Sequence, residues 1–170
     1  MKHKSTIFNL LSGLFSLLMI VPMCVVNYVL VDEFFDAQIG CGLFANWTDV
    51  GDVFTLRGFK GEFNSVFAII TSVLVCVVLA VGAIKLVLTI IGLMDKKLAK
   101  KLTKLNKLLT FVLILSSVLL IASTLVFIFT NTATGEYTNK KLYMSLGVGA
   151  YLSMGFALVS SVLAVLGNKA

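Results

Sequence analysis

The residues that could carry out acid–base, nucleophilic or metal chemistry lie outside the long apolar stretches of this sequence. All eight carboxylates fall in polar segments, and the single histidine, His3, lies in the N-terminal tail. The cysteines, Cys24, Cys41 and Cys76, form no Cys-x-x-Cys pair. Paired acids, or a histidine close to an acid, would be needed for general acid–base catalysis or metal binding. We therefore expect no enzymatic activity, and we predict no catalytic residue, no cofactor and no metal ligand.

Polar side chains inside the apolar stretches offer a second kind of chemistry, which is hydrogen bonding away from water. Lys85 is the one ionisable residue well inside an apolar run, and a charge there is costly enough to suggest a function. It lies toward one end of its run, so we favour snorkelling, in which the amine reaches the membrane surface. The alternative is that Lys85 lines a shared cavity. The predicted polar or pore-lining face consists of Asn9, Ser16, Asn27, Lys85, Thr110, Ser117 and Thr124.

Four long apolar runs must position these side chains. With 59% hydrophobic and 13% charged residues and a mean hydropathy of +1.04, the 170-residue chain is far more apolar than a soluble domain. A helix needs about 20 apolar residues to cross a bilayer. We predict an all-α membrane protein whose single domain, 1–170, is a four-transmembrane-helix bundle. The predicted spans are about 7–31, 64–93, 108–130 and 142–167.

The first run has an alternative interpretation as a cleaved secretory signal, because Lys2 and Lys4 precede it. Its 25 uncharged residues exceed the length of about 7–15 residues that is typical of a signal. A lipoprotein-like stretch at 21–24 places the bulky Met23 where a small residue is needed. We therefore expect the first run to be retained as a membrane span. Pro22 removes a backbone hydrogen bond, which predicts a kink near residues 18–22.

The basic residues are distributed unequally between the segments that connect the spans. Cytoplasmic segments of membrane proteins are enriched in lysine and arginine, and nine lysines lie in the two tails and the basic loop 94–107. Both termini should therefore be cytoplasmic, in an integral protein of the plasma membrane. The expected partners are the lipid bilayer and anionic lipid at its inner face, and nothing suggests nucleic acid. The cytoplasmic basic patch consists of Lys96, Lys97, Lys100, Lys101, Lys104 and Lys107.

The basic loop 94–107 has a helical pattern of its own. Leucines recur at 98, 102, 105 and 109 with lysines on the opposite face, and Asp95 can cap the start of a helix. Such a helix either lies in the membrane interface or prolongs the third span. A lipid-facing elbow is the favoured role, and docking to an acidic partner or a specific anionic lipid is the alternative.

The outer loop 32–63 is the longest segment between spans, and a second outer loop covers 131–141. Glycines separate short β-prone pieces such as 53–56, which predicts a small β-hairpin over the mouth of the bundle. Its aromatic rings should pack on the helix ends or lie at the headgroup level. Asn46-Trp47-Thr48 matches a glycosylation acceptor. Cys41 could pair between subunits, although a free thiol is favoured.

Small residues form two ridges at intervals of four. Helix association in lipid depends on close backbone approach, which small side chains permit. We expect both ridges to pack within the bundle, and the alternative is that at least one faces a neighbouring subunit. The predicted helix-packing residues are Ala68, Ser72, Cys76 and Ala80 in the second span, and Ser145, Gly149, Ser153, Ala157 and Ser161 in the fourth.

The segment Cys41-Gly42-Leu43-Phe44 and Trp47 share residue types with the outer loop of claudins, without the order or the second cysteine. The arrangement of spans and loops resembles that of tetraspan proteins such as claudins and of several large-pore channel families. This resemblance covers topology, so we assign no family and transfer no residue role. We expect a non-enzymatic tetraspan that acts as a scaffold or accessory subunit of an oligomeric assembly. The alternative is a homo-oligomeric channel or transport component lined by the Ser/Thr/Asn faces of spans one and three.

Overall fold

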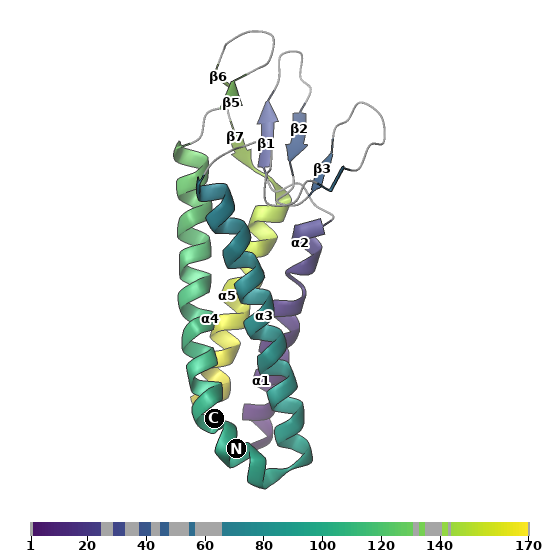
Figure 1. Ribbon diagram of the computed structural model, residues 1–170, viewed down its shortest axis with the longest axis vertical. Coiled ribbons are helices and arrows are strands. Elements are labelled where there is room, and N and C mark those ends of the chain that lie inside the picture. Colours follow the sequence, from purple (N-terminus) through teal and green to yellow (C-terminus); the bar gives the residue numbers. More distant parts are fainter. Residues whose placement is uncertain are drawn as a thin grey trace.

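The apolar runs form long helices in a computed structural model (Figure 1). The structure describes residues 2–24, 29–32, 38–41, 45–47, 55–56, 66–130, 133–134, 141–142 and 144–169. Its helices are α1 (Lys2–Leu17), α2 (Ile20–Cys24), α3 (Val66–Met94), α4 (Lys96–Thr130) and α5 (Val148–Lys169). Four helical segments are long and apolar enough to cross a membrane: Lys4–Pro22, Ile70–Met94, Lys101–Val126 and Val148–Lys169. The predicted four-helix membrane bundle is confirmed.

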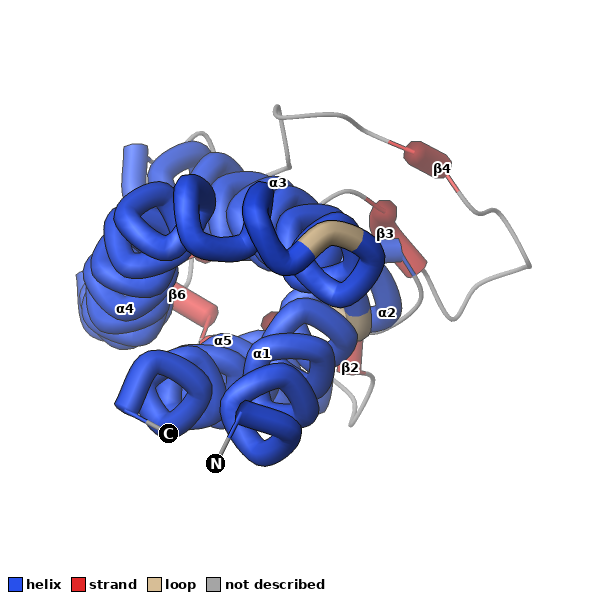
Figure 2. The backbone as a smooth tube through the Cα atoms, turned by 90° about the horizontal axis from the view of Figure 1, so that it is seen from below, coloured by secondary structure: helices blue, strands red, loops and turns tan. Residues whose placement is uncertain are grey.

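The four helices pack side by side, each against two neighbours. Helix α1 contacts α3 and α5, and α4 contacts the same two helices from the other side. Figure 2 shows this arrangement from the end where both chain termini lie. We call this the terminal end of the bundle, and side chains of all four helices can meet there.

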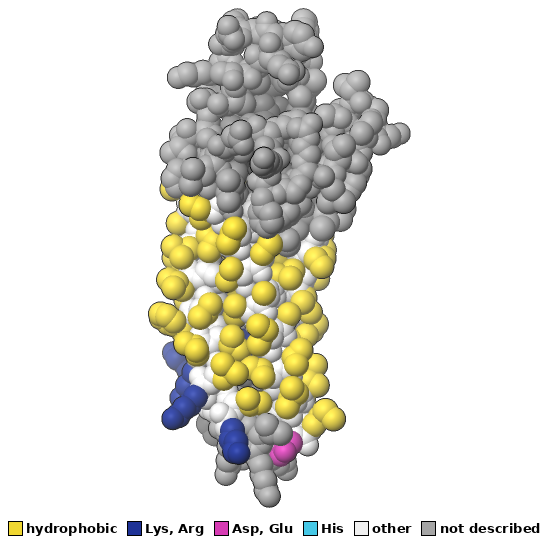
Figure 3. All heavy atoms as spheres, viewed as in Figure 1, with side chains coloured by type: hydrophobic (Ala, Val, Ile, Leu, Met, Phe, Trp, Pro, Cys, Tyr) yellow, Lys and Arg dark blue, Asp and Glu magenta, His cyan; other side chains and the backbone are white. Residues whose placement is uncertain are grey.

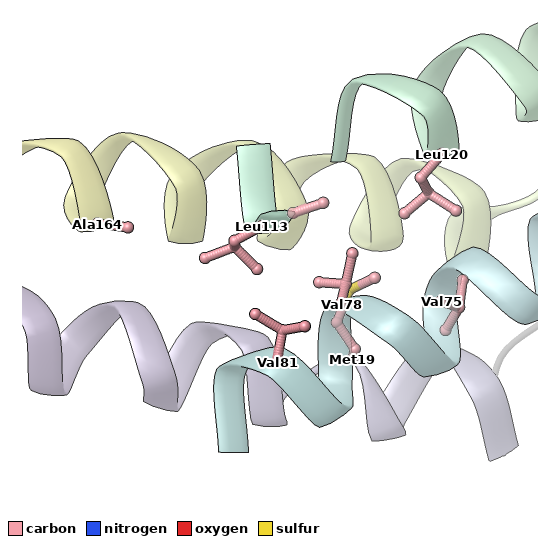
Figure 4. Packing of buried hydrophobic residues seen from close by; sticks show 8 residues of the cluster. Met19, Val75, Val78, Val81, Leu113, Leu120 and Ala164 are labelled. Atoms are coloured by element: carbon pink, nitrogen blue, oxygen red, sulfur yellow. The ribbon is translucent and has the colours of Figure 1, made fainter. Parts of the chain in front are cut away.

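The interior of the bundle contains a cluster of apolar side chains among many buried polar ones. Figure 4 shows side chains of α3, α4 and α5 pointing toward one another, together with Met19 from the turn between α1 and α2. The cluster consists of Met19, Val75, Val78, Val81, Leu113, Leu120, Ala157 and Ala164.

The outward faces are apolar too (Figure 3). Phe111, Val148 and Tyr151, for example, are each about 60% exposed, at 63%, 61% and 60%. A soluble protein rarely exposes apolar surface on this scale. These helices therefore present surfaces suited to lipid or to partner helices.

Helix α1 is interrupted before Pro22. Residues Leu18 and Met19 form a turn, and the amides of Met19 and Val21 bond to Ser16 and Leu18 at 3.2 and 3.0 Å, three residues back instead of four. Proline cannot donate the backbone hydrogen bond that would continue the helix. The predicted kink near residues 18–22 is confirmed.

The basic loop predicted at 94–107 is helical. Helix α4 begins at Lys96, one residue after α3 ends, and runs without a break to Thr130. Of the two alternatives, the segment therefore prolongs the third span. Figure 1 shows its first turns slanting beneath the bundle to meet the end of α3.

Short strands lie at the opposite end. They are β1 (Val29–Asp32), β2 (Gln38–Cys41), β3 (Ala45–Trp47), β4 (Thr55–Leu56), β5 (Ala133–Thr134), β6 (Lys141–Leu142) and β7 (Met144–Leu146). One sheet has the order β4-β3-β2-β1-β7, with β1 antiparallel to both neighbours, and β5 pairs with β6. Most of the outer loop, including its turns, lies outside the described residues, so the β-hairpin there stays a prediction.

Two span boundaries differ from those expected. The fourth helix begins at Val148 because residues 144–146 pair with β1, which places Ser145 opposite Leu30 in a sheet. The first span was expected to continue to residue 31, but 29–31 belong to β1. Backbone pairing between strands competes here with helix formation in sequences that are apolar enough for either.

Candidate functional site

The most unusual feature of the bundle is a buried cation near the terminal end. Lys85, on α3, is 0% exposed. Its Nζ donates to Asn9 Oδ1 at 2.7 Å, to Thr110 Oγ1 at 2.9 Å and to Asn106 Oδ1 at 3.0 Å. The acceptors come from α1 and α4, so the amine joins three helices.

The hydrogen-bonding pattern around this amine is suited to its protonated form. Asparagine Oδ1 atoms only accept, and the Thr110 hydroxyl already donates its hydrogen to Asn106 O at 2.9 Å. The three acceptors match the three N–H groups of an ammonium, so the site is suited to the protonated form of Lys85. Its three acceptors are uncharged, so the positive charge is solvated but not neutralised by them.

The preferred interpretation of Lys85 as a snorkelling residue was wrong. Position 85 follows Val78 and Val81 on the inward face of α3, and these side chains are buried beside it. The side chain therefore begins inside the bundle, and its amine finds acceptors there before it could reach the membrane surface.

A second set of hydrogen bonds holds these acceptors in place. Since each asparagine oxygen faces Lys85, its amide group donates elsewhere: Asn106 Nδ2 to Asn168 Oδ1 at 3.2 Å, and Asn9 Nδ2 to Gly167 O at 3.5 Å. The Ser5 hydroxyl also donates to Gly167 O. These contacts bring in α5, so the lysine site connects all four long helices.

Farther from the terminal end, hydroxyl groups join neighbouring helices in pairs. Between α1 and α5, Ser16 Oγ lies 2.5 Å from Ser160 Oγ, and Ser12 Oγ donates to Ser160 O at 2.8 Å. Between α4 and α5, Ser161 Oγ donates to Ser117 Oγ at 2.8 Å. These side chains use their hydrogen-bonding capacity inside one chain.

The structure thus separates the predicted polar face into groups. It brings Asn9, Lys85 and Thr110 together in one site, and it places Ser16 and Ser117 in different interhelical pairs. Thr124 is buried at 0% exposure. Asn27 lies outside the described residues.

The two small-residue ridges are placed differently. On α5, Gly149, Ser153, Ala157 and Ser161 are all buried against the rest of the bundle. On α3, Ser72 is buried, Cys76 half-buried and Ala80 exposed, whereas the side chains of Ala68 and Ser145 lie outside the described part. Contact of either ridge with a neighbouring subunit stays a prediction.

Sequence reasoning missed the closest helix contacts. A Cβ added to Gly82 would lie 1.9 Å from Ser16 Cβ, and one added to Gly13 would lie 2.7 Å from Leu86 Cβ. Both glycines therefore let α1 and α3 touch. A Cβ on Gly167 would lie 2.6 Å from Asn9 Oδ1, so this glycine makes room for the lysine site. Gly13, Gly82 and Gly167 lie outside the two ridges at intervals of four, so the ridge pattern did not indicate them.

An open cavity of about 230 Å³ lies at the terminal end, beside the lysine site. Asn9 and Asn106, which accept from Lys85, form part of its wall. Hydroxyl and amide groups line it from every long helix, Lys107 contributes a second cation, and Leu88, Leu93 and Leu102 add apolar surface. No carboxylate is among the described residues that line the cavity.

Other predicted features can be placed only in part. Lys101, Lys104 and Lys107 of the basic patch are exposed, whereas the side chains of Lys96, Lys97 and Lys100 lie outside the described set. Within the described ranges, no group of three or more His, Cys, Asp or Glu residues is arranged to hold a metal ion.

Comparisons with known proteins identify no family for this chain. No protein-family model matches the chain, and no curated protein matches it.

Proposed function

We propose that this protein is a non-enzymatic tetraspan that acts through contacts of its helices and loops, as a scaffold or accessory subunit of an oligomeric membrane assembly. The observation that carries this proposal is the use of the inward polar side chains within a single chain. The lysine site and the serine pairs join helices of the same bundle and leave the outward faces apolar.

The same observation weighs against the channel alternative. A ring-shaped pore lined by spans one and three would require Ser16, Thr110 and Ser117 to face a shared water-filled path. These residues are instead buried in the bundle, at 0%, 4% and 3% exposure. Apolar side chains such as Met19, Leu113 and Leu120 fill the interior between the polar pairs.

The orientation belongs to the same proposal. Lysines 101, 104 and 107 are exposed in the first turns of α4, and Figure 3 shows basic side chains gathered at the terminal end. This end would face the cytoplasm of a plasma-membrane protein because basic residues are retained there. The opposite end, with its strands, would then be available to partners outside the cell.

Subunit number and conductance together test the proposal. The full-length protein is reconstituted in nanodiscs for native mass spectrometry, and in vesicles for ion-flux measurements. We expect a small oligomer, or a complex with another membrane protein, and no flux above that of empty vesicles. A ring of five or more subunits that conducts ions would contradict the scaffold role.

A further inference from the structure

The lysine site and the neighbouring cavity together have the composition of an anion site. The Lys85 ammonium is fully buried and bonded to uncharged acceptors. Two of these acceptors, Asn9 and Asn106, also line the cavity. The charge therefore lies one amide group behind the cavity wall. An anion that accepts from the Nδ2 of either amide would lie roughly 8 Å from the charge, since two hydrogen-bond lengths and the width of the amide separate them.

This charge favours a negative ligand strongly. At an effective dielectric constant of about 20, two opposite unit charges roughly 8 Å apart attract each other enough to raise affinity up to about thirtyfold. Lys107 adds a second cation to the lining, and no acidic side chain among the described lining residues opposes it. Asn168 also lines the cavity, and its Nδ2 is a suitable donor to a phosphate oxygen because its Oδ1 already accepts from Asn106.

The depth of the cavity indicates the source of the anion. Its lining includes Thr6, Leu93, Leu102 and Gly167, which lie within a few residues of the terminal ends of the four spans. Lipid phosphates lie at this level, just outside the hydrocarbon core. The leucines could accommodate the first part of an acyl chain. Basic pockets between transmembrane helices are known to accept anionic headgroups.

We propose that the cavity binds the phosphate headgroup of an anionic lipid from the leaflet at the terminal end, with Lys85 and Lys107 providing its positive charge. The lipid site requires the four-helix membrane fold but not the scaffold role. The lipid site and the scaffold role can therefore each fail without the other.

Lipid retention measured by native mass spectrometry tests this site. The full-length protein is reconstituted in nanodiscs of equal parts phosphatidylcholine and phosphatidylglycerol, extracted in mild detergent, and scored for bound lipid of each kind. We expect phosphatidylglycerol to be retained at least about tenfold over phosphatidylcholine, and Lys85→Met to remove most of that preference. Equal retention of the two lipids by the unaltered protein would overturn the proposal.

A matched pair of exposed lysines separates the cavity from general surface attraction. Lys107 lines the cavity and Lys104, on the same helix, does not. Lys107→Gln should lower the preference for phosphatidylglycerol about fivefold, and Lys104→Gln less than about twofold. This pair also carries the test if Lys85→Met fails to fold. Equal effects of the two substitutions would mean that only the surface charge attracts lipid.

A competition with inorganic phosphate distinguishes the two sources of a phosphate group. If the site accepts a lipid, excess inorganic phosphate should leave phosphatidylglycerol bound, because the phosphate ion gains nothing from the apolar surface of the cavity. Complete displacement would overturn the assignment to lipid and identify a soluble phosphate compound as the ligand.

Discussion

Removing an acceptor from Lys85 should destabilise the bundle more than removing Lys85 itself. In Asn9→Leu, the ammonium stays buried and loses its 2.7 Å acceptor, and a hydrogen bond to a charged group is worth about 1.5–3 kcal/mol. Leucine has nearly the shape of asparagine, so steric change adds little. We expect Asn9→Leu to lower the free energy of unfolding by about 3 kcal/mol, because incomplete solvation of a buried charge adds to the lost bond.

In Lys85→Met, by contrast, the charge is gone and only uncharged acceptors lose a partner. Each such group costs about 1–3 kcal/mol if it stays unsatisfied. The desolvation cost of the ammonium, several kcal/mol, is removed at the same time. The net destabilisation should therefore be about 1–2 kcal/mol.

The double variant, Asn9→Leu with Lys85→Met, isolates the interaction. Its destabilisation should fall short of the sum of the single changes by about 1–2 kcal/mol, as for residues in direct contact. Reversible unfolding in mixed micelles, with increasing SDS, measures all three values, and Lys101→Met, on an exposed lysine, serves as the control. Additive effects, or a larger loss in Lys85→Met than in Asn9→Leu, would refute the description of Lys85 as a buried ammonium held by neutral acceptors.

Three further predictions concern packing and orientation. Gly82→Leu should lower the free energy of unfolding by about 3 kcal/mol or more, because its Cβ would lie 1.9 Å from Ser16 Cβ. Gly155→Leu is the control and should change thermal stability little, because a Cβ there meets nothing within 4 Å. Similar losses in both variants would contradict the close contact between α1 and α3 at Gly82. Ser153→Ala should be neutral or raise the free energy of unfolding by up to about 1 kcal/mol, because Ser153 Oγ is buried without a hydrogen-bond partner in the described structure. A clear loss of stability in the same SDS assay would show that this hydroxyl is bonded. Tags at residues 1 and 170 should be protected from external reagents in intact cells while a cysteine introduced at Thr48 is labelled, and labelling of either tag would reverse the proposed orientation.

The spans could be predicted because each depends on one property, an uncharged run long enough to cross a bilayer. Their precise ends could not. Residues 29–31 and 144–146 are apolar enough to continue the helices, yet they pair across two segments more than a hundred residues apart in the chain. Such pairing is a non-local property that no single apolar run reveals.

The lysine site was only partly predictable. Asn9, Lys85 and Thr110 were recognised as polar residues in apolar runs, but their convergence depends on the rotational position of three helices. Asn106 was not included in the predicted polar face, because it lies in the basic loop 94–107, outside the predicted third span. Once α4 begins at Lys96, the same residue lies on the inward face of a helix.

The order in which the acceptors of Lys85 are synthesised has a consequence for biogenesis. Asn9 emerges from the ribosome before α3, whereas Asn106 and Thr110 follow it. When α3 enters the membrane, its lysine can find one permanent partner, and the other two arrive only with α4. A lysine inside the hydrocarbon core costs up to about 2.5–3.5 kcal/mol, the value for the bilayer centre. Helix α3 should therefore enter the translocon's lateral gate readily but leave it late. We expect chains truncated before residue 106 to stay crosslinked to the translocon longer than chains that include α4, and Lys85→Leu to abolish the delay; equal residence times would show that the lysine is accommodated without α4.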